Sequence, residues 1–312
     1  MTIQRRVVTG MIVATVAAAG SCFGATLPPP DATGVPAQII VTVLPGPGGS
    51  QPQRLEGGEL TVVEAKSPAR VIRLERLSGD LANLQLFILL DDSTRSSSLG
   101  VHIPELKTFI QSLPPTTQVA VGYMRNGTAA MAQSFTLDHR QAADAVRLPN
   151  AIPGENGSPY FALSDVVKHW PTPEPGGRRA ILMLTDGVDR YWGTGVMDDP
   201  YLDEAVHNAL KQGVLVYSIY LRGSGLYGRG AWVRDFAQSR LIQVSEETGG
   251  NAYFETFSDP VDIAPFLSDL GSRLQNQYRV RIDARGKGVQ PVKVRTEAPG
   301  LKVAGPSRVF VP

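Results

Sequence analysis

Two clusters of carboxylate and hydroxyl side chains follow apolar runs and could together hold a hard cation. The run 84–90 leads directly into Asp91-Asp92-Ser93-Thr94-Arg95-Ser96, and the run 181–185 leads into Asp186-Gly187. Carboxylate and hydroxyl oxygens are the ligands that Mg²⁺ prefers, whereas Cys and His suit softer metals. If both runs are strands of one parallel sheet, the two clusters meet at its carboxyl edge, where such sheets bind ligands.

The elements that would position these clusters alternate between strand and helix. Apolar runs predict strands at 84–90, 118–123, 129–135, 180–185, 214–221 and 252–254. Amphipathic stretches between them predict helices at 101–112, 138–147, 160–169, 200–212, 230–248 and 260–275. The turn at Asn126-Gly127 predicts one antiparallel hairpin. We therefore predict an α/β fold: a doubly wound, mainly parallel sheet with helices on both faces, spanning 81–275.

The two ends of the chain are different in character from this middle part. Residues 26–37 carry four prolines and are predicted to be a linker. Short β-branched runs separated by Gly, Pro and Ser predict a small β unit over 38–80. Alternating residues at 277–284 and later short runs predict strands in 276–312. We expect the C-terminal strands to pack with the N-terminal unit.

The acidic clusters and the order of elements resemble the von Willebrand factor type A (VWA) family, in its exported bacterial form. In that family the first strand ends in Asp-x-Ser-x-Ser and a later strand in Asp-Gly, and these residues form a metal-ion-dependent adhesion site for Mg²⁺ or Mn²⁺. The resemblance implies that Asp91, Ser93 and Asp186 are ligands. Ser158 is the candidate for a further hydroxyl ligand. Arg95 departs from the pattern, because it stands where a hydroxyl is expected.

The arginine leaves two registers open for the site. A guanidinium near the site would repel a divalent cation and could pair with Asp91 or Asp186 instead. A register shifted by one residue, Asp92-x-Thr94-x-Ser96, restores all three residue types. It moves the first carboxylate one residue beyond the strand, however, where its direction reverses if the chain is still extended. We therefore favour the register that begins at Asp91, with a degenerate metal site.

Other residues whose types could take part in catalysis or ligand binding have simpler explanations. Gly223-Ser224-Gly225-Leu226-Tyr227-Gly228 matches a dinucleotide-binding fingerprint, but it follows a late strand. The four histidines show no metal-ligand spacing, and no Gly-x-Ser-x-Gly nucleophile elbow is present. An envelope hydrolase or a nucleotide-dependent enzyme is thus the alternative to a binding protein. Aromatic residues in loops are typical of contact sites. The predicted partner-binding face comprises Arg95, Tyr191, Trp192, Tyr227 and Trp232.

Residues 1–25 predict export. Arg5 and Arg6 precede an uncharged apolar run, and small residues follow at 20–25, as in a signal peptide. Cys22 is the only cysteine, so cleavage after it would leave a protein without a thiol. Ala19-Gly20-Ser21-Cys22 also resembles a lipoprotein box, which leaves a lipid anchor at Cys22 open. The prediction is a secreted, periplasmic or envelope protein.

Composition narrows the function further. Of the 312 residues, 42% are hydrophobic and the formal net charge is +1, which fits a globular chain without an overall field for nucleic acid. We therefore predict an extracytoplasmic protein-binding, adhesion or scaffold domain that is not an enzyme. The partner is predicted to be another protein. Contact with a membrane would come only through the lipid anchor at Cys22.

Overall fold

The computed structural model describes residues 34–46, 54–93, 96–152, 157–172, 177–191, 199–222, 230–255 and 260–312. The predicted signal peptide at 1–25 with Cys22, and most of the linker predicted at 26–37, lie outside the described residues. So do Thr94, Arg95, Trp192, Tyr227, the glycine-rich loop at 223–228 and the side chain of Ser96.

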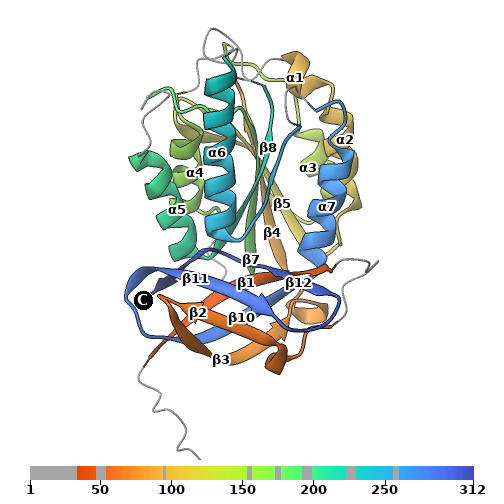
Figure 1. The fold of residues 1–312 in the computed structure, drawn as a ribbon. Coiled ribbons are helices and arrows are strands. Elements are labelled where there is room, and N and C mark those ends of the chain that lie inside the picture. Colours follow the sequence, from red (N-terminus) through yellow and green to blue (C-terminus); the bar gives the residue numbers. More distant parts are fainter. Residues whose placement is uncertain are drawn as a thin grey trace, which may run out of the picture. The chain divides into compact units, whose positions relative to one another are not determined.

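A six-stranded sheet forms the centre of the predicted VWA-like region, with the strand order β6-β5-β4-β7-β8-β9 (Figure 1). Its strands are β4 (Leu84–Asp91), β5 (Thr117–Arg125), β6 (Thr128–Thr136), β7 (Arg178–Thr185), β8 (Val214–Tyr220) and β9 (Ala252–Tyr253). Only β6 is antiparallel to its neighbour, as the Asn126-Gly127 turn predicts. Every residue of β4 and β8 is buried, as expected of parallel strands covered on both faces.

Helices cover both faces of this sheet. The helices α2 (Ile103–Ser112), α3 (His139–Asp144) and α7 (Ala264–Gln275) pack on the face that carries Leu86, Ile88 and Leu90. The helices α4 (Pro159–Lys168), α5 (Pro200–Gln212) and α6 (Ala231–Thr248) pack on the face that carries Phe87 and Leu89 (Figure 1). A short helix, α1 (Ser96–Gly100), precedes α2. No helix in the described ranges is long and apolar enough to cross a membrane.

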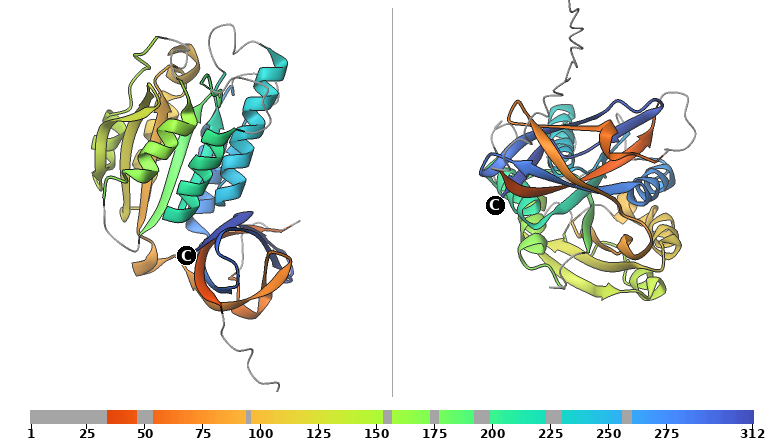
Figure 2. Two further views of the ribbon diagram at one scale, coloured as in Figure 1. Left: turned by 90° about the vertical axis from the view of Figure 1, so that its left-hand side faces the viewer. Right: turned by 90° about the horizontal axis from the view of Figure 1, so that it is seen from below.

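The largest sheet is antiparallel, curled and built from both ends of the chain (Figure 2). Its strand order is β12-β1-β10-β3-β2-β11-β13. The strands are β1 (Val35–Pro45), β2 (Leu60–Glu64), β3 (Ser67–Arg76), β10 (Gln277–Ala284), β11 (Gly288–Thr296), β12 (Leu301–Ala304) and β13 (Arg308–Val311). Short 3-10 turns lie at η1 (Gly57–Glu59) and η2 (Gly79–Leu81). N- and C-terminal strands pair directly, with Ile39 opposite Val280. The strands enclose their own apolar core, which includes Val41, Val62 and Ile282.

These sheets confirm the predicted fold class in part and correct the rest. The mixed α/β sheet with helices on both of its faces is confirmed. The doubly wound description of the fold is not confirmed, because the largest sheet is antiparallel and curled. The β part is also not a small unit, since it has seven strands against six in the mixed sheet. Its first strand begins at Val35, inside the segment predicted as linker.

Candidate binding site

Asp91 and Asp186 lie at the same edge of the mixed sheet, as their positions in the sequence predict. The strands β4 and β7 pair in parallel with Leu90 opposite Leu184, so both chains reach this edge together. The Thr185 hydroxyl donates a hydrogen bond of 3.0 Å to Asp91 Oδ2, which joins the two strand ends. Both carboxylates are buried, with exposures of 1% for Asp91 and 2% for Asp186.

The Asp91 carboxylate is held by its own loop as well. The Ser93 backbone N–H and the Ser93 hydroxyl donate to Asp91 Oδ1 at 2.9 and 2.8 Å. Burial and the nearby negative charge of Asp186 raise the pKa of Asp91 to about 6, against the opposing effects of Ser93 and Arg190. Asp91 therefore changes charge near neutral pH, and Ser93 faces it as the predicted register requires.

A resident cation, Arg190, pairs with Asp186. Arg190 Nη2 lies 2.5 Å from Asp186 Oδ2, and the Val188 N–H donates to Asp186 Oδ1 at 3.0 Å. The Arg190 side chain is 14% exposed, so the pair is largely shielded from water. Burial alone would lower the pKa of Arg190. The negative charges of Asp186 and Asp91 have the larger combined effect and raise the pKa. The sequence predicts a built-in cation at Arg95, which lies outside the described residues, and did not single out Arg190. Arg190 could have been recognised from the sequence as a partner of Asp186, because it follows Asp186 by four residues in the same loop.

Ser158 lies in the neighbouring loop with its hydroxyl already engaged. It is the N-cap of α4, where its oxygen accepts hydrogen bonds from the N–H groups of Tyr160 and Phe161. The same hydroxyl donates to Asp189 Oδ2 at 2.6 Å, and both side chains are fully buried. Gly157 is tied to the Asp186 loop too, because its carbonyl accepts the Arg190 N–H at 2.7 Å. The sequence did not single out Asp189.

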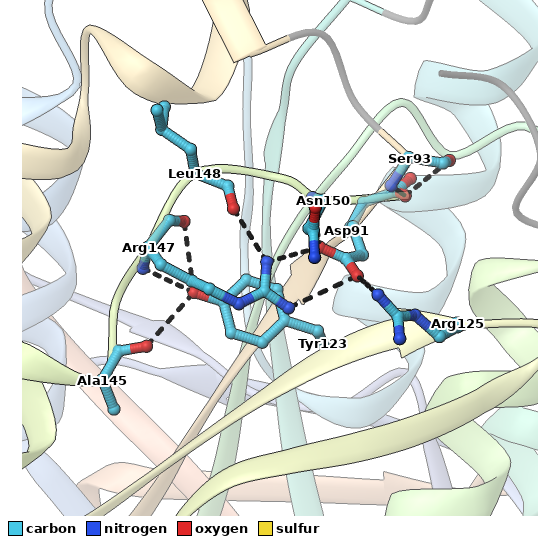
Figure 3. A network of polar contacts seen from close by, with 9 residues as sticks. Asp91, Ser93, Tyr123, Arg125, Ala145, Arg147, Leu148 and Asn150 are labelled. Carbon is cyan, nitrogen blue, oxygen red and sulfur yellow. Dashed lines mark hydrogen bonds and ion pairs between the residues drawn. The ribbon is translucent and has the colours of Figure 1, made fainter. Parts of the chain in front are cut away.

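Asp92 belongs to a different network from that of Asp91, one that includes Arg125, Arg147 and Asn150, which Figure 3 shows. Arg125 and Arg147 each donate to its carboxylate at 2.8 Å, and the Asn150 N–H donates at 2.9 Å. Burial favours the neutral acid, but the hydrogen bonds from Arg147 and Asn150 prevail and lower the pKa of Asp92. In the shifted register Asp92 would be the first metal ligand. Its oxygens are instead taken by two guanidinium groups.

Among the described residues at this edge, the donors are engaged with one another and do not form an open divalent-cation site. Mg²⁺ needs several oxygen ligands in a near-octahedral arrangement. The oxygens of Asp91 accept from Ser93 and Thr185, and those of Asp186 accept from Arg190 and Val188. Within the described residues, no cluster of three or more Asp, Glu, His or Cys is placed to hold a metal ion. The arrangement can instead present a buried, internally neutralised acid–base cluster beside a surface.

Exposed apolar side chains lie at the same carboxyl edge, in loops and in the first turn of α6. Tyr191 is 59% exposed, and its backbone N–H donates to Asp189. Trp232, 60% exposed, opens α6 and stacks on Phe236. Leu148 and Ile152, 52% and 69% exposed, follow Arg147, and the intervening Ala151 N–H donates to the Asp92 carbonyl. We define Leu148, Ile152, Tyr191 and Trp232 as the strand-end face. Of the predicted partner-binding residues, the structure describes Tyr191 and Trp232.

Comparison with known proteins finds resemblance in structure alone. No protein-family model matches the chain, and no curated protein matches its sequence. A von Willebrand factor type A structure from Catenulispora acidiphila is 13% identical with a TM-score of 0.46, covering 89% of this chain and 74% of that one. The conserved hypothetical protein BatB from Bacteroides thetaiotaomicron is 14% identical with a TM-score of 0.43, covering 61% of this chain and 97% of that one.

A third solved structure gives the same result. An aerotolerance-related membrane protein from Bacteroides fragilis is 13% identical with a TM-score of 0.44, and the match covers 61% of this chain and 98% of that one. The solved structures that resemble this chain in fold thus include a VWA domain, as the sequence predicts. At these identities and TM-scores the likeness says nothing about activity, partner or location.

Proposed function

We propose that this chain is an exported protein-binding domain that docks another protein on its strand-end face without recruiting a divalent cation. The observation that carries the proposal is the set of exposed apolar side chains at the carboxyl edge of the mixed sheet, the edge that also carries the closed Asp186–Arg190 pair. Contact sites are typically rich in aromatic residues and bordered by polar groups. Here Tyr191 and Trp232 supply the aromatic surface, and the half-exposed side chains of Arg125 and Arg147 supply polar groups at the same edge.

The contacts of Ser93 favour binding over hydrolysis. A serine nucleophile needs an adjacent base and access to substrate. The Ser93 hydroxyl does face a carboxylate, that of Asp91, but Ser93 is only 2% exposed. Its hydrogen bond is therefore part of the loop that follows β4. The alternative of an envelope hydrolase is weaker for this reason.

Matched leucines at opposite ends of the mixed sheet test the docking surface. Leu148 is 52% exposed on the strand-end face, and Leu137 is 57% exposed after β6, whose antiparallel direction places its end at the other edge. A photo-crosslinking residue at position 148 should capture a defined protein from the envelope fraction, and the same residue at 137 should not. Trp232→Ser should weaken capture at 148, and a chelator should leave it unchanged. Equal capture at both positions, or loss with the chelator, contradicts the proposal.

A metal titration tests the closed site directly. A unit positive charge ~4 Å from a cation costs on the order of 4 kcal/mol at an effective dielectric near 20. We therefore expect calorimetry to show weak Mg²⁺ and Mn²⁺ binding, or none, by the unmodified protein. Arg190→Ser should strengthen binding, and the double variant with Asp186→Ala should lose the gain. Tight binding that Arg190→Ser does not change would show that the arginine does not compete with metal.

Export is the remaining part of the proposal, and it depends on residues 1–25. Mass spectrometry of the envelope or secreted fraction should find a protein that begins between Cys22 and Thr26. A lipidated Cys22 would identify the anchored form. A soluble cytoplasmic protein that retains Met1 would contradict export, and it would leave the binding proposal to the crosslinking experiment.

A further inference from the structure

A cavity of about 500 Å³ lies at the opposite, amino edge of the mixed sheet. It opens between α2 and α7, beside the link from β3 to β4 and the first residues of β4 and β7. Its apolar wall comprises Leu84, Phe109, Leu113, Leu267 and Leu274. The volume lies within the roughly 300–1,000 Å³ that is usual for small-molecule sites.

Arg178 is the one charged residue among the described residues that line this cavity. It is the first residue of β7 and is 7% exposed. Its Nη1 donates to the Leu274 carbonyl at 2.5 Å and to Gln277 Oε1 at 2.7 Å, and its Nη2 donates to the Ala82 carbonyl at 2.7 Å. All three acceptors are neutral. The guanidinium is therefore fixed in place without being neutralised.

Two donors of this guanidinium remain available. A guanidinium has five N–H groups, and the contacts above use three of them. The buried Nε–H has no acceptor, and no Asp or Glu in the described part of the chain pairs with Arg178. Burial and the nearby positive charge of Arg279 lower the pKa of Arg178 to about 10, so it stays charged at neutral pH. A buried charge that lacks a counterion is costly, and an anionic ligand would remove that cost.

We propose that this cavity binds a small apolar molecule with a single carboxylate, whose carboxylate pairs with Arg178 while its chain packs between Phe109 and Leu267. A carboxylate matches a guanidinium because two oxygens can accept parallel N–H donors. A phosphate is a poorer match, because its larger charge calls for several cationic partners and the described lining offers one. The proposal is independent of the strand-end face, since the cavity lies at the other edge of the sheet.

Calorimetry on the full mature chain tests the proposal with octanoate as the probe. Octan-1-ol and octyltrimethylammonium have the same chain with a neutral and a cationic head. We expect octanoate to bind one site, octan-1-ol at least tenfold more weakly, and the cation not at all. No binding of octanoate overturns the proposal. Equal binding of octanoate and octan-1-ol also overturns it, because the carboxylate would then contribute nothing.

Two variants separate the charge from the cavity. Arg178→Met should reduce octanoate affinity at least tenfold and leave octan-1-ol unchanged. Gly271→Leu on α7 should abolish binding of both, because a Cβ there points toward the cavity and meets Phe109 Cε2 at an ordinary 3.8 Å. Gly271→Leu also keeps the test valid if Arg178→Met does not fold. Ser239→Leu, on the exposed side of α6, is the matched control and should bind normally. Unchanged octanoate binding by Gly271→Leu would place the ligand elsewhere.

Discussion

Largely shielded arginines lie at the two ends of the strand β7, Arg178 as its first residue and Arg190 in the loop that follows it, and they differ in what they face. Arg190, after the carboxyl end, contacts the Asp186 carboxylate, which in turn lies near Asp91. Arg178, at the amino end, contacts two backbone carbonyls and an amide oxygen. The first guanidinium is neutralised by the protein itself, and the second is only solvated by it.

The partner of a buried cation decides whether the site around that cation is closed to an external ligand or open to one. At the carboxyl edge the acid–base pair satisfies itself, so an external metal would have to displace an arginine. At the amino edge the charge lacks a counterion within the described residues, so an external anion would complete the site. The resemblance to VWA domains directs attention to the first edge, whereas the contacts of Arg178 direct it to the second.

The largest expected effect comes from breaking the closed pair. Arg190→Met leaves two neighbouring carboxylates, Asp186 and Asp91, buried without a cation. Removing one partner of a buried pair costs about 3–5 kcal/mol, so we expect a loss of that size in the free energy of unfolding at neutral pH. Urea denaturation measures it. Adding Asp186→Asn should recover part of the loss. A loss below about 1 kcal/mol would show that water solvates Asp186 well enough to replace the arginine.

The next effect is the pH dependence of stability caused by Asp91. Its pKa is about 6 in the folded protein against the ordinary 3.8, so the folded state binds the proton more tightly than the unfolded state. Stability due to this group is therefore present at low pH and falls as pH rises through about 6, by up to about 3 kcal/mol. Asp91→Asn should remove this fall. Urea unfolding gives the free energy of unfolding of the variant and of the unmodified protein. The variant's value minus that of the unmodified protein should rise between about pH 4.5 and 7.5. A constant difference would contradict the raised pKa.

Much of the carboxyl edge could be predicted from the sequence. Parallel strands at 84–90 and 180–185 require Asp91 and Asp186 to reach one edge, and pairing of Leu90 with Leu184 places them there. The pairs that close the site could not be predicted, because a loop's conformation decides which nearby cation reaches a carboxylate. Arg190 approaches Asp186 only because the loop turns back toward Gly157.

The β part and the cavity were harder to predict from the sequence for a different reason. Strands such as β1 and β10 pair across more than two hundred residues, and periodicity reports faces but not distant partners. The linker prediction at 26–37 used prolines, yet Pro36 fits in β1 opposite Asp283. Nothing in the sequence around Arg178 shows that it faces the Ala82 carbonyl, before β4, and the Leu274 carbonyl, in the last turn of α7. Such a cavity exists only once the helices have packed.

A smaller effect distinguishes Asp92 from its neighbour Asp91. Asp92 has a lowered pKa because Arg147 and Asn150 donate to its charged form. Its stabilising contribution is therefore present above the ordinary pKa and is lost only as pH falls below about 4. Asp92→Asn should cost about 1–2 kcal/mol, and the cost should be the same between about pH 5 and 8. Urea unfolding over this pH range measures the cost. A cost that falls as pH rises, as expected for Asp91, would contradict the lowered pKa of Asp92.

The smallest effect is expected at Arg125, and it tests whether burial makes Arg190 important. Arg125 also pairs with a carboxylate, Asp92, at 2.8 Å, but its side chain is 45% exposed against 14% for Arg190. Exposed pairs contribute about 0–1 kcal/mol, because water and salt screen them. Arg125→Gln should therefore cost less than about 1 kcal/mol, and less still at high salt, while the cost of Arg190→Met should hardly change with salt. Urea unfolding of both variants at low and high salt makes the comparison. Equal costs with equal salt dependence would mean that charge pairing alone, without burial, explains the closed site.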